Sequence, residues 1–318
     1  MLFYFISLII LFFTAFLYIK IATYFNIIDN PNHRSSHSAP TIRGGGVLFF
    51  IAVLIFFFGS DYQYPYFVLA VSLLSIVSFV DDLITLSSKI RLPFQFIAMS
   101  FILLEMGFFE NPMWLILPLI VIGVGFINIY NFMDGINGIT GLYSIVTLTS
   151  LFFINKENPL IEESLIVTVL ISLIIFGFYN FRKKARFFAG DIGSISIAMV
   201  LFFIGFLLMI QLKAPVISLL ILVYGIDATL TLVYRKIIGE HITQPHRHHL
   251  YQKLVDVLKW SHLKVAVFFG FTQLLVNLVV YKTYQLHLSI QFSIVTGIIF
   301  IFMILYYIIF KRLKRIGV

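Results

Sequence analysis

Long apolar segments recur along this chain and constrain its fold more than any other feature. Of its 318 residues, 60% are hydrophobic and only 11% are charged, whereas about 25% of a soluble domain is charged. A membrane-spanning helix needs roughly 17–25 mainly apolar residues. Eleven stretches approach or meet this length, at 1–19, 44–59, 66–80, 92–109, 113–130, 139–154, 164–181, 193–211, 215–234, 264–281 and 289–310. The sequence therefore predicts an all-α, polytopic integral membrane protein with about 11 transmembrane helices.

Lysine and arginine lie almost entirely on one side of this predicted topology. All of the 22 Lys and Arg residues except Lys156, Lys213 and Lys282 share the side of the loops at 20–43, 81–91, 131–138, 182–191 and 235–264 and the tail at 311–318. The positive-inside rule makes that side cytoplasmic, with the N-terminus outside and the C-terminus inside. We expect residues 1–19 to be a retained helix, because no positive region precedes them and no small-residue cleavage site follows.

Acidic residues and histidines gather on the same predicted side, and every histidine except His287 lies there. A topology signal needs only Lys and Arg, so this pooling indicates one cytoplasmic active site. We expect a single transmembrane catalytic domain, 1–318, whose site is formed by the loops 20–43, 81–91, 131–138, 182–191 and 235–263. Cysteine is absent, which excludes disulfides.

The first of these loops carries Arg34, His37 and Arg43 and runs into three successive glycines, 44–46. Arginine holds phosphate through its fork-shaped guanidinium, and glycine lets the backbone or a ligand approach closely. The loop is therefore a candidate anion-binding segment. A solvated loop whose arginines only set the topology is the alternative.

Two adjacent carboxylates, Asp81 and Asp82, end the third apolar stretch. They repel each other unless a cation lies between them, and Mg²⁺ usually takes one or two carboxylates plus substrate phosphates. The alternative, a helix C-terminus exposed to water, is weak because Asp is unfavourable at the negative end of a helix dipole. The pair is a candidate metal site.

A polar stretch between two apolar runs contains Asn131, Asp134 and Asn137, spaced three residues apart. If the segment is helical, the three side chains point roughly one way. Asn, Asp and Gly are costly in hydrocarbon or poor in helices, so chemistry at the membrane–water boundary is the simplest reason for their presence.

Gly190-Asp191-x-Gly193-Ser194 precedes the eighth apolar run. This pattern favours a helix N-terminus with a carboxylate that faces a metal or phosphate. The alternative is that Asp191 only caps the helix. The preceding Phe187 and Phe188 could stack on a nucleotide base or serve as interface aromatics.

Asp227 lies about midway along the ninth stretch, and an intramembrane carboxylate is a functional hypothesis by default. Beyond it, His246-Arg247-His248-His249 invites a zinc interpretation. The chain has no cysteine, and adjacent histidines lack the usual i, i+4 spacing of metal ligands. A phosphate-binding cluster fits better.

Taken together, these motifs resemble the polyprenyl-phosphate N-acetylhexosamine-1-phosphate transferase family, which is the bacterial glycosyltransferase family 4. The chain looks most like its undecaprenyl-phosphate N-acetylglucosaminyl-1-phosphate transferase branch. The matching blocks arise in family order over roughly 29–260: Arg34-Ser-Ser-His37-x-x-Pro40-Thr41-x-Arg43-Gly44-Gly45, Asp81-Asp82, Asn131-Phe-Met-Asp134-Gly135, Gly190-Asp191-x-Gly193-Ser194, Asp227 with Arg235-Lys236, and His246-Arg247-x-His249. Asn137 departs from the family, because many members carry Asp there.

The resemblance implies an enzyme that moves an N-acetylhexosamine-1-phosphate, or a 6-deoxy relative, from a UDP-sugar to undecaprenyl phosphate and releases UMP. It implies Mg²⁺, or Mn²⁺ as a substitute, on Asp191 with Asp81 and Asp82. It assigns catalytic roles to Asp81, Asp82, Asp191 and His249. It assigns nucleotide or sugar contacts to His37, Arg43, Asn131, Asp134, Asn137, Asn180, Phe188, Arg247 and His248.

The implied setting is the bacterial inner membrane, at the first membrane step of O-antigen, common-antigen, teichoic-acid or related synthesis. The implied partners are a UDP-N-acetylsugar and undecaprenyl phosphate, with no nucleic acid and with room for a homodimer. The peptidoglycan enzyme phospho-MurNAc-pentapeptide transferase is the alternative within the family. An ion-coupled transporter using Asp227, or an intramembrane protease using Asp191 and Asp227, are the alternatives from other classes.

Overall fold

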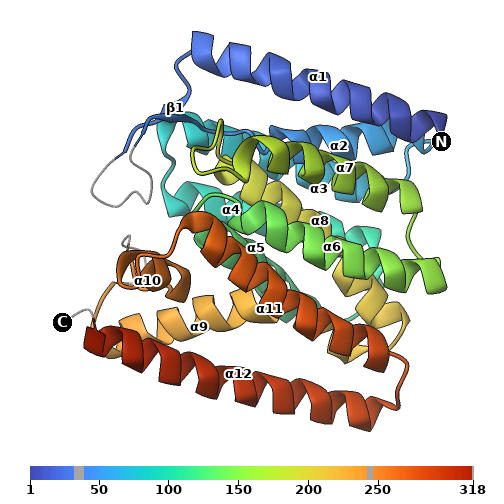
Figure 1. The fold of residues 1–318 in the computed structure, drawn as a ribbon. Coiled ribbons are helices and arrows are strands. Elements are labelled where there is room, and N and C mark those ends of the chain that lie inside the picture. Colours follow the sequence, from blue (N-terminus) through green and yellow to red (C-terminus); the bar gives the residue numbers. More distant parts are fainter. Residues whose placement is uncertain (32–38, 242–245, 317–318) are drawn as a thin grey trace.

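Each of the eleven predicted apolar segments forms a helix in the computed structural model, which describes residues 1–31, 39–241 and 246–316 (Figure 1). The helices are α1 (Leu2–Tyr24), α2 (Val47–Gly59), α3 (Pro65–Ile84), α4 (Ser88–Glu105), α5 (Met113–Met133), α6 (Ile139–Glu157), α7 (Glu163–Asn180), α8 (Gly190–Gln211), α9 (Leu222–Ile237), α11 (His262–Thr283) and α12 (Leu288–Ile316). Shorter elements are the 3₁₀ helices η1 (Phe108–Glu110) and η2 (Pro215–Ile221), the helix α10 (Leu250–Asp256), and the strands β1 (Ile28–Asp29) and β2 (Thr41–Ile42). The predicted all-helical fold is confirmed.

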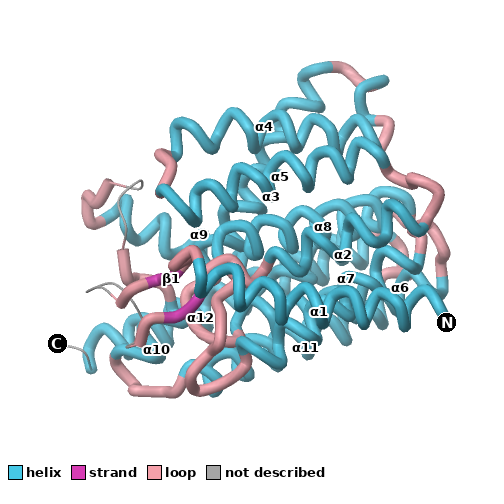
Figure 2. The backbone as a smooth tube through the Cα atoms, turned by 90° about the horizontal axis from the view of Figure 1, so that it is seen from above, coloured by secondary structure: helices cyan, strands magenta, loops and turns pink. Residues whose placement is uncertain are grey.

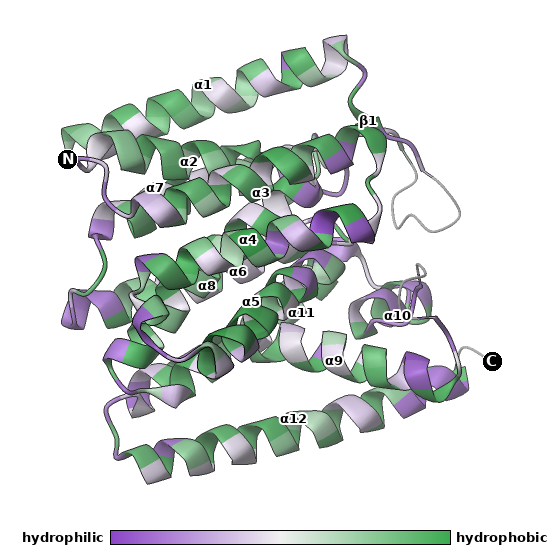
Figure 3. Cartoon of the chain, turned by 180° about the vertical axis from the view of Figure 1, so that it is seen from behind, coloured by the Kyte–Doolittle hydropathy of each residue, from purple (hydrophilic) through white to green (hydrophobic). Residues whose placement is uncertain are grey.

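Nine helices within the described ranges are long and apolar enough to cross a membrane, counting η2 and α9 as one span. The other two predicted spans correspond to α2, which is apolar but has only 13 residues, and to α4, which carries Lys89 and Arg91 near its start. The two chain ends lie at opposite ends of the bundle, as an odd number of crossings requires (Figure 1). Hydrophilic residues gather toward the ends of the helices and apolar residues fill their lengths (Figure 3).

Helix α8 is the centre of the bundle. Its apolar window is 78% buried, whereas the corresponding windows of α1 and α12 are only 22% and 6% buried. These two helices form the outer edges of the bundle (Figure 1), and the two short strands lie at the end of the bundle where the C-terminus is marked (Figure 2). A helix that is apolar on all sides is buried in a core. Because neighbouring helices surround α8, the residues in its first turn are held in a fixed position.

The glycines 44–46 pack directly against the start of α8. The Gly45 N–H donates to the Phe188 carbonyl at 2.7 Å, and the Gly46 N–H donates to the Ala189 carbonyl at 3.0 Å. A Cβ atom on Gly46 would lie 2.1 Å from the Cα atom of Gly193. The glycines therefore allow the close approach that was expected, between two backbone segments. This contact joins the first loop to the loop before α8.

The ninth span is divided into η2 and α9, whereas the apolar stretch 215–234 predicted one continuous helix. At the junction of η2 and α9, the Val223 N–H donates to Gln273 Oε1 at 3.1 Å, and Gln273 Nε2 donates to the Leu219 carbonyl at 2.8 Å. Thr147 donates to the Leu220 carbonyl at 3.1 Å. A break in a membrane helix is tolerated where neighbouring side chains satisfy the freed backbone groups, and here α6 and α11 supply them.

Candidate active site

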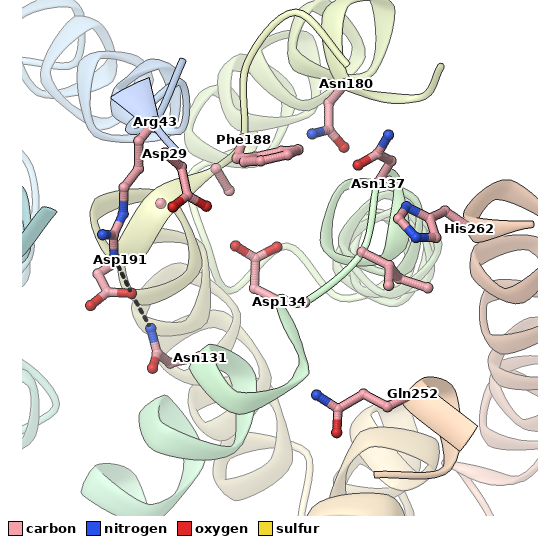
Figure 4. Close-up of a pocket in the computed structure, with 14 residues that line it drawn as sticks. Asp29, Arg43, Asn131, Asp134, Asn137, Asn180, Phe188, Asp191, Gln252 and His262 are labelled. Carbon is pink, nitrogen blue, oxygen red and sulfur yellow. Dashed lines mark hydrogen bonds and ion pairs between the residues drawn. The ribbon is translucent and has the colours of Figure 1, made fainter. Parts of the chain in front are cut away.

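A cavity of about 260 Å³ is lined by residues from six separate parts of the chain (Figure 4). They come from β1 and the end of the first loop, the end of α5 and the turn after it, the end of α7, the start of α8, α10, and the start of α11. The lining side chains include Asp29, Arg43, Asn131, Asp134, Asn137, Asn180, Phe188, Asp191, Gln252 and His262. The lining therefore contains seven of the predicted site residues: Arg43, Asn131, Asp134, Asn137, Asn180, Phe188 and Asp191.

Asp191 lies in the first turn of α8 and faces this cavity. Asn131 Nδ2 donates to Asp191 Oδ1 at 2.9 Å (Figure 4) and to Ser194 Oγ at 3.0 Å. Arg91 Nη1 lies 3.3 Å from Asp191 Oδ2, and Arg43 Nη2 lies 3.8 Å from Asp191 Oδ1. The side chain remains 20% exposed, so this carboxylate is oriented by three neighbours and still accessible. It does not cap its own helix, because no side-chain cap bond occurs at the start of α8.

Asp82 performs that capping task from another helix. Its carboxylate accepts hydrogen bonds from the N–H groups of Asp191 at 2.9 Å and Ile192 at 3.2 Å. Arg43 Nε lies 2.6 Å from the same carboxylate, which is fully buried. A negative charge at a helix N-terminus is favourable. Gly190, with φ of +72°, leaves room for this contact, since a Cβ there would lie 2.4 Å from Asp82 Oδ2. The observed contacts of Asp82 position α8.

Asp81 is joined to Asp191 through Arg91. Arg91 Nη1 lies 2.7 Å from Asp81 Oδ2, and Asp81 also accepts from the Leu86 N–H. In the sequence, Arg91 is only one of the basic residues on the predicted cytoplasmic side. Its spacing from Asp81 in the chain gives no signal of this bridge, because the bridge depends on how α3, α4 and α8 pack.

The stretch 131–138 is not one helix, contrary to the simplest form of the prediction. Helix α5 ends at Met133, and Gly138, with φ of +83°, precedes α6. Asn131, Asp134 and Asn137 nevertheless line the same cavity, because the turn brings them round it (Figure 4). Burial raises the pKa of Asp134 to about 6.

Two amides fix the rim of the cavity. Asn180 Oδ1 accepts from the Gly138 N–H at 2.7 Å, and its Nδ2 donates to the Phe187 carbonyl at 2.9 Å. Asn137 Nδ2 donates to the Arg182 carbonyl at 3.0 Å. An aspartate at position 137 has no N–H to donate, so the asparagine has a definite structural effect here.

Asp227 organises the histidine cluster. It is almost fully buried and accepts from the Leu250 N–H at 2.9 Å and the Tyr251 N–H at 3.3 Å, at the start of α10. His249 Nδ1 lies 3.3 Å from Asp227 Oδ1, and Tyr306 donates to the same oxygen at 3.2 Å. Asp227 therefore orients His249. It shares no hydrogen bond with Asp191 in the described residues, which speaks against a dyad of these two carboxylates.

His249, His248 and Arg247 do not line the cavity in the described part of the chain. Arg247 forms a two-pronged ion pair with Asp256, at 2.8 and 3.0 Å, and His248 Nε2 lies 2.9 Å from Glu240 Oε1. The hydrogen bond from His248 lowers the pKa of Glu240. The cluster is joined to the cavity lining through Gln252, whose Oε1 accepts from the His249 N–H at 3.2 Å. The predicted residue His37 lies outside the described residues.

No group of three or more His, Cys, Asp or Glu side chains able to hold a metal occurs in residues 1–31, 39–241 and 246–316. The oxygens of Asp82 already accept from two backbone N–H groups and from Arg43. Asp134 and Asp191 are the better-placed carboxylates, because both line the cavity. Mg²⁺ commonly takes only one or two carboxylates and completes its shell with substrate phosphates and water, so the residues fit an ion that arrives with a phosphorylated substrate.

Residues 64–210 match the sequence profile described as glycosyl transferase family 4. A probable undecaprenyl-phosphate N-acetylglucosaminyl 1-phosphate transferase of Bacillus subtilis is 27% identical over 74% of this chain and 72% of its own length. An undecaprenyl-phosphate alpha-N-acetylglucosaminyl 1-phosphate transferase of Yersinia pestis is 27% identical over 78% and 75%. A phospho-N-acetylmuramoyl-pentapeptide-transferase of Thermotoga neapolitana is 23% identical over 79% and 87%.

Proposed function

We propose that this chain is a member of glycosyl transferase family 4 that transfers an N-acetylhexosamine-1-phosphate from a UDP-sugar to undecaprenyl phosphate and releases UMP. One observation carries the proposal. Asp191 faces a cavity that also presents an aromatic ring, four amide side chains and two further carboxylates, and Arg43 and Arg91 hold the Asp191 carboxylate in place. The cavity lies at the end of a membrane-spanning bundle, where a soluble and a lipid-bound substrate can meet.

The donor nucleotide is proposed to occupy the cavity. Phe188 offers a ring on which uracil can stack, since stacking on an aromatic ring suits any base. Asn137 and Asn180 lie beside it (Figure 4) and keep the rim in place through their backbone contacts. Arg43 would attract the pyrophosphate, because guanidinium groups pair well with phosphate oxygens.

Asp191 and Asp134 are proposed to hold Mg²⁺ together with the pyrophosphate. When bound, the ion would neutralise charge on the phosphoryl oxygens. Asp81 and Asp82 were the other predicted ligands. Their contacts in this structure suit them better to fixing Arg91 and the start of α8, so we propose that they act by positioning Asp191.

In the proposed reaction, a phosphate oxygen of undecaprenyl phosphate attacks the β-phosphorus of the donor. A new P–O bond forms, the bond from the β-phosphorus to the oxygen that bridges it to UMP breaks, and UMP leaves with that oxygen and its electron pair. Arg43 and Arg91 stabilise the negative charge that gathers on the transferred phosphoryl group, which is most of what such a transfer requires. His249, oriented by Asp227, is proposed to contact the acceptor phosphate or the sugar.

The site is proposed to face the cytoplasm of a bacterial inner membrane, because the positive-inside rule places its loops there. N-acetylglucosamine is the proposed sugar, since the relatives from Bacillus subtilis and Yersinia pestis are described as N-acetylglucosaminyl transferases. The relative from Thermotoga neapolitana makes the pentapeptide-bearing donor the competing candidate.

The test is UMP release by the purified chain with Mg²⁺ and undecaprenyl phosphate, using UDP-N-acetylglucosamine, UDP-N-acetylgalactosamine and UDP-N-acetylmuramoyl-pentapeptide in turn. We expect turnover with N-acetylglucosamine, a loss of at least about 100-fold in Asp191→Asn, and normal turnover in the matched control Asp61→Asn. Asp61 is exposed and lies in the turn between α2 and α3. Turnover with the pentapeptide donor alone would reassign the substrate. If none of the three donors yields UMP, the transferase proposal is refuted.

A further inference from the structure

A second hollow, larger and apolar, lies between α9 and α12. It has a volume of about 790 Å³, several times that of the cavity around Asp191. Its walls include Leu230, Val233, Tyr234, Met303, Tyr306 and Phe310. It shares no lining residue with the cavity around Asp191 in the described part of the chain. We refer to it as the α9–α12 groove.

The groove exists because the middle of α12 packs less closely against the bundle than its two ends do: Ile294, Ile298 and Phe302 contact the core but are only partly buried. The buried residues of α12 are Gln291 at one end and Tyr306, Phe310 and Leu313 toward the other. Gln291 donates to the carbonyls of Tyr284 and Leu286, at 3.0 and 2.8 Å. Between these anchors the helix has no buried residue. Figure 1 shows it as the outermost helix on its side of the bundle. Water is unfavourable in an apolar hollow at this depth, so hydrocarbon chains are its natural filling.

Three cations of α12, Lys311, Lys314 and Arg315, also line the groove. None of them forms an ion pair with a carboxylate in the described residues. Lys314 Nζ lies 5.6 Å from the ring centre of Tyr234, and Lys311 Nζ lies 5.7 Å from that of Tyr307. Among residues 1–31, 39–241 and 246–316, their charges therefore lie at the polar end of an apolar hollow with no carboxylate paired to them.

A fourth cation, Lys253 of α10, adds to this charge. Its Nζ lies 4.8 Å from the ring centre of Phe310, a groove residue. Burial and the nearby charge of Lys314 lower the pKa of Lys253. The nearest candidate counter-charge, Asp256, is already engaged by Arg247. An anionic group at this end of the groove would relieve the crowding.

From this geometry we infer that the α9–α12 groove binds one resident anionic phospholipid, with its acyl chains along Leu230, Val233 and Met303 and its phosphate against Lys311 and Lys314. Apolar walls with a cationic end match the two parts of such a lipid. A second copy of this chain docked symmetrically would bring the same cations face to face. The acceptor lipid must place its phosphate in the cavity beside Asp191, and the cations of the groove do not line that cavity.

The bound lipid would also support the histidine cluster. Tyr306 lines the groove, and its hydroxyl donates to Asp227, which caps α10 and orients His249. A lipid that holds α12 against α9 therefore keeps Tyr306 in place. Lipid occupancy and the geometry at His249 are therefore linked through two successive hydrogen bonds, from Tyr306 to Asp227 and between Asp227 and His249.

Native mass spectrometry of the full chain in neutral detergent tests this inference without any need for turnover. Phosphatidylglycerol, phosphatidylcholine and undecaprenyl phosphate are titrated separately into delipidated protein. We expect one tightly bound phosphatidylglycerol per chain. Lys311→Gln/Lys314→Gln should weaken its binding about 30-fold, because each basic residue near an anionic lipid surface contributes about a factor of five.

The matched control is Lys183→Gln/Lys184→Gln, which removes the same charge from two exposed residues of the loop between α7 and α8. Its affinity should stay within about twofold of the wild type, because neither residue lines the groove. A second variant, Val233→Trp, fills the apolar part and keeps the cations, and it should also release the lipid.

Three outcomes would overturn the inference. Equal binding of phosphatidylglycerol by the Lys311/Lys314 variant and its control would show that these two lysines do not bind the headgroup. Tighter binding of undecaprenyl phosphate, lost in the same variant, would assign the groove to the acceptor. A lipid-free dimer that persists in the wild type and dissociates in Val233→Trp would assign it to a second copy of the chain.

Discussion

Asparagine at position 82 should destabilise the protein because Asp82 holds the start of α8. The side chain is 0% exposed and accepts from two backbone N–H groups and from Arg43. Asparagine keeps one acceptor oxygen and turns an NH₂ group toward a donor. An unsatisfied buried donor costs about 1–3 kcal/mol, and a bond to a charged group contributes about 1.5–3 kcal/mol. Part of this is recovered because a buried charge is removed, so we expect a net loss of about 2–4 kcal/mol.

Thermal unfolding of detergent-purified protein measures this effect. The loss corresponds to a melting temperature lowered by roughly 5 °C in Asp82→Asn. Asp191→Asn is the matched comparison, because it makes the same chemical change in the residue whose backbone N–H contacts Asp82 and leaves that N–H in place. Its carboxylate is 20% exposed, so we expect a shift of under about 2 °C but a much larger loss of turnover. If Asp82→Asn melts like the wild type, or if both variants shift equally, the capping role is wrong.

Three further substitutions test other parts of the structure. Gly46→Ala should destabilise the chain by about 1–3 kcal/mol in thermal melts, because the new Cβ would meet Gly193 Cα at 2.1 Å; Gly177→Ala, with open space around it, is the control and should not. Asn137→Asp removes the donor to the Arg182 carbonyl and should raise KM for the UDP-sugar more than it lowers kcat, and an unchanged KM would contradict this. Asp134 has a folded-state pKa of about 6, raised by burial above its unfolded value, so the folded state holds the proton more tightly. The wild type should therefore lose stability relative to Asp134→Asn as pH rises from about 4 to 7, and a difference independent of pH would refute it.

The sequence predicted the helices well because their signal is local. A run of about 20 apolar residues has few alternatives to a membrane helix, and all eleven predicted segments are helical. The match of residues 64–210 to the profile of glycosyl transferase family 4 agrees with the family that the motifs resembled. The gathering of Arg43, Asn131, Asp134 and Asp191 at one cavity is also as expected.

The sequence alone could not predict the roles of the buried carboxylates Asp82 and Asp227. Asp82 caps a helix that begins more than 100 residues later, and Asp227 caps α10 across a loop. Either residue read alone resembles a reactive group, because capping a distant helix leaves no mark in local spacing. Arg91 was missed as a site residue for the same reason. The break before α9 depends on Gln273 and Thr147, which lie on other helices.

The most direct test of the proposed reaction follows the β-phosphorus of the donor. UDP-N-acetylglucosamine labelled with ³²P at the β-position is incubated with the purified chain, Mg²⁺ and undecaprenyl phosphate, and the lipid and nucleotide products are separated. Transfer of a sugar-1-phosphate predicts that the label enters the lipid and that one unlabelled UMP is released per labelled lipid. Label recovered in UDP, with the sugar attached to the lipid, would contradict the proposed bond cleavage.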